Sequence, residues 1–370
     1  MTTLLDDRSM VQRVFDHIEH GTTDTSDSIW REPVANYRSP LRLDAERALL
    51  RRLPVPFCPS AALPQEGSYL ARDAAGTPLF AVRGADGVVR AFRNACRHRG
   101  VQVASGAGCA KAFACRYHGW TYGLDGSLRF VPHEDGFPGL DRESHGLVPV
   151  TAVERAGLVF VAQAPRPGDS GLLDELPELI ASNQKLFASG EFTLPANWKL
   201  FLEGFLEGYH IKTTHPTSFL PYGFDNLNVI EHFGRNSRVT FPFQRIQKQA
   251  ALPPEARRVE GALTYVYQVF PNAIVTVLSR HTVFLILEPI SLTETRVSSW
   301  RLSNRSASES TGTEDAQRDA AFVNDTGGAE DAAMVTSIQR GMAAGANEFF
   351  TYGRFEGAIA HFHRELDRLL

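Results

Sequence analysis

The hydrophobic positions near the N-terminus recur with the period of an α-helix. Met10, Val14 and Ile18 are spaced four residues apart within 5–20, and a shorter apolar run with helical spacing occupies 44–52. Polar residues and prolines separate the two runs. The pattern therefore predicts two amphipathic helices joined by a segment that crosses the surface.

The pattern changes to short strand-like runs between about residues 54 and 165. Apolar segments such as 78–82 and 88–92 are separated by Asp86-Gly87, a dipeptide that favours a β-hairpin. This stretch is expected to form a small all-β domain.

The remainder of the chain mixes the two periods. Helices are predicted over 172–189, 198–209, 314–325, 328–344 and 353–369. Strands are predicted over 227–233, 237–245, 263–269, 273–279, 282–288 and 294–302. An antiparallel sheet that grips a helix, followed by C-terminal helices, predicts an α+β fold. We therefore expect an N-terminal helical segment at 1–52, an all-β domain at 53–165 and an α+β domain at 166–370.

Composition and charge narrow the class of protein. The chain has 370 residues, of which 43% are hydrophobic and 22% charged, and its net charge is −4. These values are ordinary for a globular protein and favour neither nucleic acid nor an anionic membrane as a partner. No apolar run reaches the roughly 20 residues that cross a bilayer, and the N-terminus lacks the pattern of a signal peptide. We expect a cytoplasmic protein.

Two short motifs in the predicted β domain combine cysteine with histidine. Cys96-x-His98 and Cys115-x-x-His118 are separated by sixteen residues. Two thiolates and two imidazoles are the ligand set of a Rieske [2Fe–2S] cluster, in which two histidines replace two cysteines on one iron. A structural zinc site is the alternative, but zinc motifs usually pair residues of one type. The motifs therefore predict a one-electron relay.

A second group of metal-binding residues lies in the predicted helix after the β domain. Glu207 and His210 are three residues apart and share one helix face. His215 follows five residues later, about 140° away on an unbroken helix. Both imidazoles therefore reach one metal only if the helix breaks near residues 212–213, and Pro216 favours such a break. Two histidines and one carboxylate form the ligand set of a non-haem Fe(II) oxygenase.

The third ligand of this second site is expected from a distant element. Asp331, on the predicted helix 328–344, is the best candidate, and Glu330 is its close competitor. Because acidic residues on a helix more often face solvent, the residues alone leave the choice open.

Taken together, these motifs resemble those of the catalytic α subunits of Rieske non-haem iron oxygenases, the ring-hydroxylating and demethylating oxygenases. The resemblance extends from about residue 40 to the end of the chain. It rests on Cys96-x-His98, Cys115-x2-His118-Gly-Trp120, Asn197-Trp198-Lys199, Glu207-x2-His210-x4-His215 and Glu330-Asp331 followed by Gln339-Arg340-Gly341. It implies an all-β Rieske domain, a helix-grip (START-like) catalytic domain, and Asp331 as the third iron ligand.

The resemblance also implies partners and roles. It assigns to Glu207 a bridge between a cluster histidine of one subunit and an iron-binding histidine of the next, and therefore implies a homotrimer. Electrons from NAD(P)H would arrive through a separate reductase or ferredoxin, and the mononuclear Fe(II) would use O2. Most ring dioxygenases carry Asp at the position of Glu207, whereas some oxygenases of quaternary ammonium compounds carry Glu.

Aromatic residues downstream are candidates for the lining of a substrate cavity. They are Phe205, Phe219, Tyr222, Phe224, Phe241, Phe243 and Phe284. Such a lining suits a hydrophobic or aromatic small molecule, and it also suits a trimethylammonium group through cation–π contact. We predict hydroxylation of an aromatic or hydrophobic small molecule. The alternatives are N- or O-demethylation, including that of quaternary ammonium compounds, electron transfer or redox sensing through the cluster alone, and a helix-grip lipid carrier.

Overall fold

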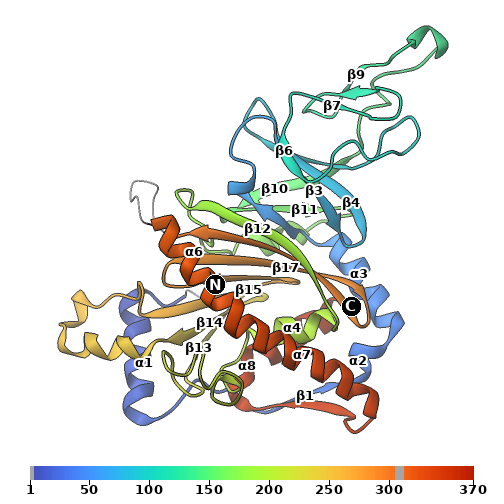
Figure 1. Ribbon diagram of the computed structural model, residues 1–370. Helices are drawn as coiled ribbons and strands as arrows, with labels where there is room; N and C mark the ends of the chain where they lie inside the picture. The colour runs from blue at the N-terminus through green and yellow to red at the C-terminus, as the bar shows by residue number, and fades with distance from the viewer. Residues whose placement is uncertain (1–3, 305–311) are drawn as a thin grey trace. The chain divides into compact units, whose positions relative to one another are not determined.

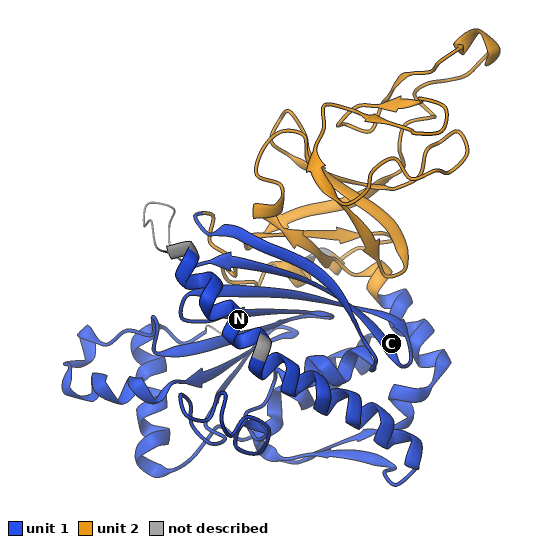
Figure 2. Cartoon of the chain, in the orientation of Figure 1, with its two compact units in different colours: residues 1–49, 183–370 blue, residues 50–182 orange. Residues whose placement is uncertain are grey.

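The computed structural model describes residues 4–304 and 312–370 (Figure 1). The chain forms two compact units (Figure 2). We call residues 50–182 the small unit, and residues 1–49 together with 183–370 the large unit. No helix in the described ranges is both long and apolar enough to cross a membrane.

Two antiparallel sheets make up the small unit. The larger has seven strands in the order β2-β11-β10-β5-β4-β3-β6, and the smaller consists of β7, β8 and β9. Phe80, Phe113, Trp120 and Tyr122 belong to a buried core to which both sheets contribute. The strands are β2 (Val55–Pro59), β3 (Ser68–Ala74), β4 (Thr77–Arg83), β5 (Val89–Arg93), β6 (Ala107–Cys109), β7 (Phe113–Ala114), β8 (Thr121–Tyr122), β9 (Leu128–Phe130), β10 (Pro149–Arg155) and β11 (Leu158–Ala162).

The large unit is built on a seven-stranded antiparallel sheet in the order β12-β18-β17-β16-β15-β14-β13. Its strands are β12 (Lys185–Leu194), β13 (Val229–Phe233), β14 (Asn236–Pro242), β15 (Leu263–Val269), β16 (Ala273–Val277), β17 (His281–Ser291) and β18 (Glu294–Ser303). A two-stranded sheet pairs β1 (Trp30–Pro33) with β19 (Phe349–Tyr352). The sheet and the helices around it confirm the α+β prediction.

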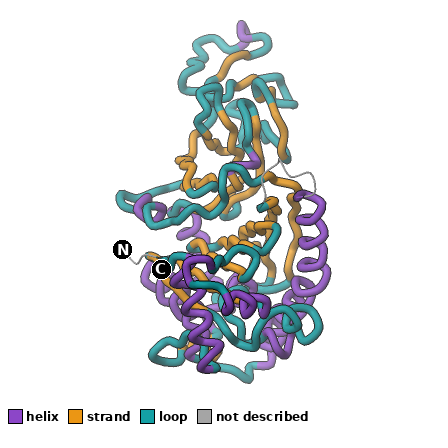
Figure 3. The backbone as a smooth tube through the Cα atoms, turned by 90° about the vertical axis from the view of Figure 1, so that its left-hand side faces the viewer, coloured by secondary structure: helices purple, strands orange, loops and turns teal. Residues whose placement is uncertain are grey.

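Helices surround the sheet of the large unit. They are α1 (Asp7–His20), α2 (Ala35–Arg38), α3 (Pro40–Arg52), α4 (Trp198–Gly204), α5 (Ile211–Thr214), α6 (Gly312–Val323), α7 (Ala329–Gly341) and α8 (Gly357–Leu369). A π-helical turn, Asn324–Gly328, joins α6 to α7, so that 312–341 form one helical run. This run packs against β17 and β18 at one end and against α4 at the other (Figures 1 and 3).

The helix predicted over 172–189 is wrong. A short 3-10 turn, Asp169–Leu173, ends at the start of this segment, and residues 185–189 at its other end belong to strand β12, which pairs with β18. Pro177 lies in the middle of the apparent helical pattern and removes a backbone donor, so an α-helix cannot continue through it. The apolar residues Leu176 and Leu179 are buried all the same, in a segment without regular secondary structure.

Buried polar contacts fix α4, the helix that leads into the second metal-binding motif. The side chain of Asn197 accepts a hydrogen bond from the amide of Lys199 and so caps the helix N-terminus. The Lys199 ammonium lies 2.6 Å from Glu46 on α3, and the indole of Trp198 donates to the same carboxylate over 2.9 Å. Asn197, Trp198 and Lys199 therefore all hold the start of α4 in place.

Candidate functional site

The two Cys/His motifs of the small unit form turns of the same kind, one after β5 and one after β7. In the first, the amide of Gly100 donates to the carbonyl of Cys96 over 2.8 Å. In the second, Gly119 donates to Cys115 over 2.9 Å. Both glycines have positive φ, +80° and +74°, which a side chain would disfavour. A glycine four residues after each cysteine thus closes each turn.

The side chains of the two turns gather at one end of the small unit's core. Cys96 and Cys115 are each only 4% exposed. The rings of His98 and His118 lie 4.6 Å apart between centroids, and Trp120 stacks on His98 at 5.1 Å. The thiols therefore face the core, whereas His118 is exposed to solvent.

These side chains suit the predicted cluster. Nδ1 of His98 is buried and has no hydrogen-bond partner in the part of the chain that the structure describes. A buried nitrogen without a partner is unfavourable, and a metal ion would supply the missing interaction. Cys96 and Cys115 are free thiols, and Tyr122 Oη lies 3.2 Å from the Cys96 sulfur. The assignment of the four side chains as cluster ligands stays a prediction.

The second motif breaks out of its helix earlier than predicted. α4 ends at Gly204, a poor helix former, so Glu207 and His210 do not share a helix face. They lie in the turn between α4 and α5, with His210 at the N-cap of α5 and His215 at its C-cap. The expected break near residues 212–213 is therefore wrong, because the chain already turns before His210.

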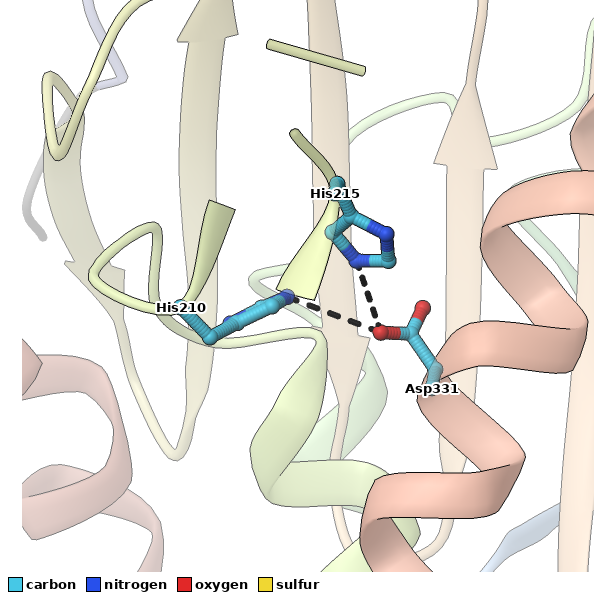
Figure 4. Close-up of side chains that lie close together, drawn as sticks. All are labelled: His210, His215 and Asp331. Carbon is cyan, nitrogen blue, oxygen red and sulfur yellow. Dashed lines mark ion pairs between the residues drawn. The ribbon is translucent and has the colours of Figure 1, made fainter. Parts of the chain in front are cut away.

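The structure brings His210, His215 and Asp331 together (Figure 4). One potential ligand atom from each lies within 4.8 Å of the others. Nε2 of His215 is 2.8 Å from Oδ1 of Asp331, and Nε2 of His210 is 3.6 Å from the same oxygen. The two histidines come from either end of α5 and the aspartate from the first turn of α7.

The other ring nitrogen of each histidine meets a different carboxylate. Nδ1 of His210 contacts Oε1 of Glu207, and Nδ1 of His215 lies 2.7 Å from Oε2 of Glu330. Ser218 donates to that same Glu330 oxygen over 2.6 Å. Metal-binding histidines usually carry such an outer carboxylate, which fixes the ring. Glu330 therefore does not compete with Asp331 for the centre, because it occupies the far side of the His215 ring.

The electrostatics of this group suit a cation. Burial lowers the pKa of His210, but Glu207 and Asp331 outweigh it and leave that pKa above its ordinary value. The pKa of His215 is likewise raised, because Asp331 and Glu330 outweigh burial. Nε2 of His215 is buried, and the Asp331 carboxylate oxygen 2.8 Å away is its partner in the described part of the chain. A divalent metal at the centre would balance the carboxylates and engage this nitrogen.

A close contact places the α6–α7 run beside the histidines. The ring of Phe219 lies 4.6 Å from that of His215. Gly327, in the π-helical turn, packs so closely on Phe219 that a Cβ atom would stand 1.9 Å from the ring. Any larger residue would displace Phe219 from His215. The π turn thus lets the run approach the histidines and begin α7 just before Asp331.

The triad lies in the wall of a cavity of about 850 Å³ in the large unit. Six of the seven aromatic residues expected in the lining are there: Phe205, Phe219, Tyr222, Phe224, Phe241 and Phe243. The prediction for Phe284 is wrong. Val283 and Leu285 line the cavity, so Phe284 points to the opposite face of the sheet, where it stacks on Trp300 at 5.2 Å.

The same cavity contains polar residues that the motif analysis missed. They are Arg245, His281, Arg301 and Asp319. The alternation of side chains between the two faces of β17 could have placed His281 in the cavity, because His281 shares a face with Val283 and Leu285. The partner of His281 was not readable, since Asp319 lies 38 residues away on α6.

Two family models match the chain. The Rieske [2Fe–2S] domain matches residues 54–148, and the ring-hydroxylating α-subunit catalytic domain matches residues 182–370, about half of the chain. The structure also superimposes on that of the quaternary ammonium Rieske monooxygenase CntA in complex with L-carnitine. The TM-score is 0.77 at 23% identity, over 94% of this chain and 96% of that one.

Oxygenase subunits of two monooxygenases are among the proteins similar in sequence. The oxygenase subunit of carnitine monooxygenase from Acinetobacter pittii is 33% identical over 201 residues, 51% of this chain and 54% of the relative. That of glycine betaine monooxygenase from Chromohalobacter salexigens is 37% identical over 160 residues, 42% of this chain and 36% of the relative. These matches span about half of the first relative's length and about a third of the second's.

Proposed function

The chain belongs to the ring-hydroxylating α-subunit family of Rieske oxygenases, and from this we propose that it oxidises a quaternary ammonium compound at a carbon bonded to nitrogen. The observation that carries the proposal is the convergence of His210, His215 and Asp331 in the wall of an aromatic cavity. Iron bound by these residues would leave positions open and supply activation of O2.

The proposed reaction balances with the known demands of oxygenases. One atom of O2 enters a C–H bond next to nitrogen, and the other leaves as water with two electrons and one proton from NAD(P)H and a second proton from solvent. The resulting carbinolamine breaks its C–N bond and releases an amine, an aldehyde and a proton. The aldehyde is formaldehyde when the oxidised carbon is a methyl group.

Three features support this substrate class over a plain aromatic. The relatives named above act on carnitine and glycine betaine, which both carry a trimethylammonium group. The cavity beside the triad is lined by aromatic rings, whose faces attract a cation. Glu207, which contacts His210, is also the residue type expected in oxygenases of quaternary ammonium compounds.

Turnover of purified holoenzyme with a reductase tests the proposal. Carnitine, γ-butyrobetaine and glycine betaine would be supplied separately while O2 uptake and aldehyde release are measured. We expect at least one to give aldehyde in proportion to O2, and His210→Ala to abolish it. If none gives aldehyde, while indole or naphthalene gives a hydroxylated product, the reaction is ring hydroxylation.

Ring hydroxylation is the second candidate, because nine phenylalanine and tyrosine side chains line the cavity and the matching family carries that activity in its name. For either reaction we propose a separate reductase or ferredoxin as electron donor. We also propose a homotrimer in which Glu207 connects the cluster of one subunit to the iron of the next.

A further inference from the structure

One end of the cavity is polar. His281, the first residue of β17, is fully buried, and its Nδ1 lies 2.9 Å from Oδ2 of Asp319 on α6. Its Nε2 is also buried and has no hydrogen-bond partner in 4–304 or 312–370. An ionised carboxylate only accepts hydrogen bonds, so Nδ1 of His281 is protonated and donates a hydrogen bond to Asp319. Nε2 of His281 is therefore available to a ligand that enters the cavity.

Two arginines line the cavity with His281. Arg301 on β18 is the cross-strand partner of Val283, which shares a face with His281, so its side chain stands on that face too. Arg245 lies with its guanidinium 4.3 Å from the centre of the Phe243 ring and donates to Ser279 Oγ. Away from the metal centre, the charged residues of the described lining are these two arginines and Asp319. That wall is therefore net positive.

This polar end is distant from the metal centre. Asp319 and Asp331 lie on the one helical run and are twelve residues apart. A rise of about 1.5 Å per residue separates them by roughly 18 Å along the helix axis. Both line the same cavity, so the aromatic rings share one space with the triad and with the wall that carries the two arginines.

From this arrangement we propose that His281 and Arg301 bind a carboxylate of the substrate and so fix which carbon stands beside the metal triad. The proposal rests on the proposed function for its reaction, but it concerns binding alone. Arg301 supplies a guanidinium, and the doubly protonated His281 donates from Nε2 to the substrate carboxylate while Nδ1 donates to Asp319. The long separation favours acids with an extended chain over glycine betaine.

Titration calorimetry of the holoenzyme under nitrogen tests this anchor. The probes are two acid–amide pairs, γ-butyrobetaine with its primary amide and 4-phenylbutyrate with 4-phenylbutyramide. We expect the wild type to bind each acid at least tenfold more tightly than its amide. His281→Gln and Arg301→Met should each reduce that preference to less than threefold. Arg301 is only half-buried, so its variant remains informative if His281→Gln fails to fold.

Arg280→Gln is the matched control. Arg280 precedes His281, pairs with Asp315 on α6 over 2.9 Å and lies outside the cavity lining, so the variant removes the same charge without changing the wall. It should keep the wild-type preference. Equal binding of acids and amides by the wild type, or an unchanged preference in both cavity variants, would overturn the anchor. The phenyl pair contains no quaternary nitrogen, so this result is independent of whether aldehyde is released.

Discussion

The two candidate metal sites are built in opposite ways. In the small unit, four candidate ligands lie between Cys96 and His118, and two similar glycine-closed turns present them. In the large unit, the triad joins a short helix after α4 to α7, more than a hundred residues further along the chain. The first site is encoded by local turns, and the second depends on the packing of the whole unit.

The contacts that support the two sites also differ, being local in the small unit and long-range in the large unit. Backbone hydrogen bonds and stacked rings hold the small unit's turns. Carboxylates hold the triad, with Glu207 behind His210 and Glu330 behind His215. A site whose support is long-range and charged should respond to distant substitutions, and a site whose support is local should not.

The largest expected effect separates the two sites outright. Asp331→Ala should lower turnover at least a thousandfold and remove the mononuclear iron, while the visible absorption of the cluster persists, because each site lies in its own compact unit. Cys96→Ser should give the reverse pattern. Metal analysis and absorption spectra would check both, with the exposed Glu314→Ala as control. Turnover of Asp331→Ala within tenfold of wild type would contradict the triad.

A smaller loss is expected from the outer carboxylate. Glu330→Gln should weaken iron binding or turnover by about 10–100-fold, because it removes the charge behind His215. Ser218→Ala removes only one hydrogen bond to Glu330 and should cost less. Iron affinity measured against a competing chelator would compare them. Equal losses of iron affinity in Glu330→Gln and Ser218→Ala would contradict the role of the Glu330 charge.

The support of the large unit can be tested through α4. Lys199→Met should reduce the free energy of unfolding of that unit by about 3 kcal/mol, because the buried Glu46 carboxylate loses the ammonium 2.6 Å away and keeps only the more distant Arg42 guanidinium at 3.2 Å among the described cations. Urea titration would follow tryptophan fluorescence, to which the large unit contributes Trp30, Trp198 and Trp300 and the small unit only Trp120, and cluster absorption for the small unit. The cluster transition should stay in place. Adding Glu46→Leu should recover part of the loss, because it removes the unbalanced carboxylate but also the acceptor of the Trp198 indole, and a lack of any recovery would argue against the ion pair.

The smallest expected effect is on the stability of the large unit at acidic pH. The rings of His232 and His361 stack 4.1 Å apart, and burial lowers the pKa of each to about 4. Unfolded histidine binds its proton near pH 6.5, so the unfolded chain holds more protons between these values. The large unit should therefore lose stability as pH falls from about 6.5 to 4. His361→Gln should flatten the dependence of Tm on pH by a few °C, and the exposed His20→Gln should not.

The sequence predicted the parts of the molecule that neighbouring residues determine. The cluster motifs were readable because each glycine-closed turn is complete within five residues. The strand at 263–269 was predicted with its observed limits. The helix at 172–189 was misjudged, because burial of Leu176 and Leu179 in an irregular segment imitates a helical pattern.

Long-range features were less accessible. Asp331 was distinguished from Glu330 only by family resemblance, because consecutive acids on a helix look alike until the ring of His215 is placed between them. Phe284 was assigned to the cavity because its aromatic character was clear and its face of the strand was not. The pairing of His281 with Asp319 required the position of α6 against the sheet.

The π-helical turn at Asn324–Gly328 has a geometric consequence for this wall of the cavity. On an uninterrupted α-helix, twelve residues would rotate Asp331 about 120° away from the direction of Asp319. A turn closed by i→i+5 bonds holds more residues, so each residue contributes less rotation and the two carboxylates come closer in azimuth. Insertion or loss of one residue there would change the angular phase between the two ends of the run. This short stretch can therefore re-aim one end of the cavity relative to the other without altering any ligand.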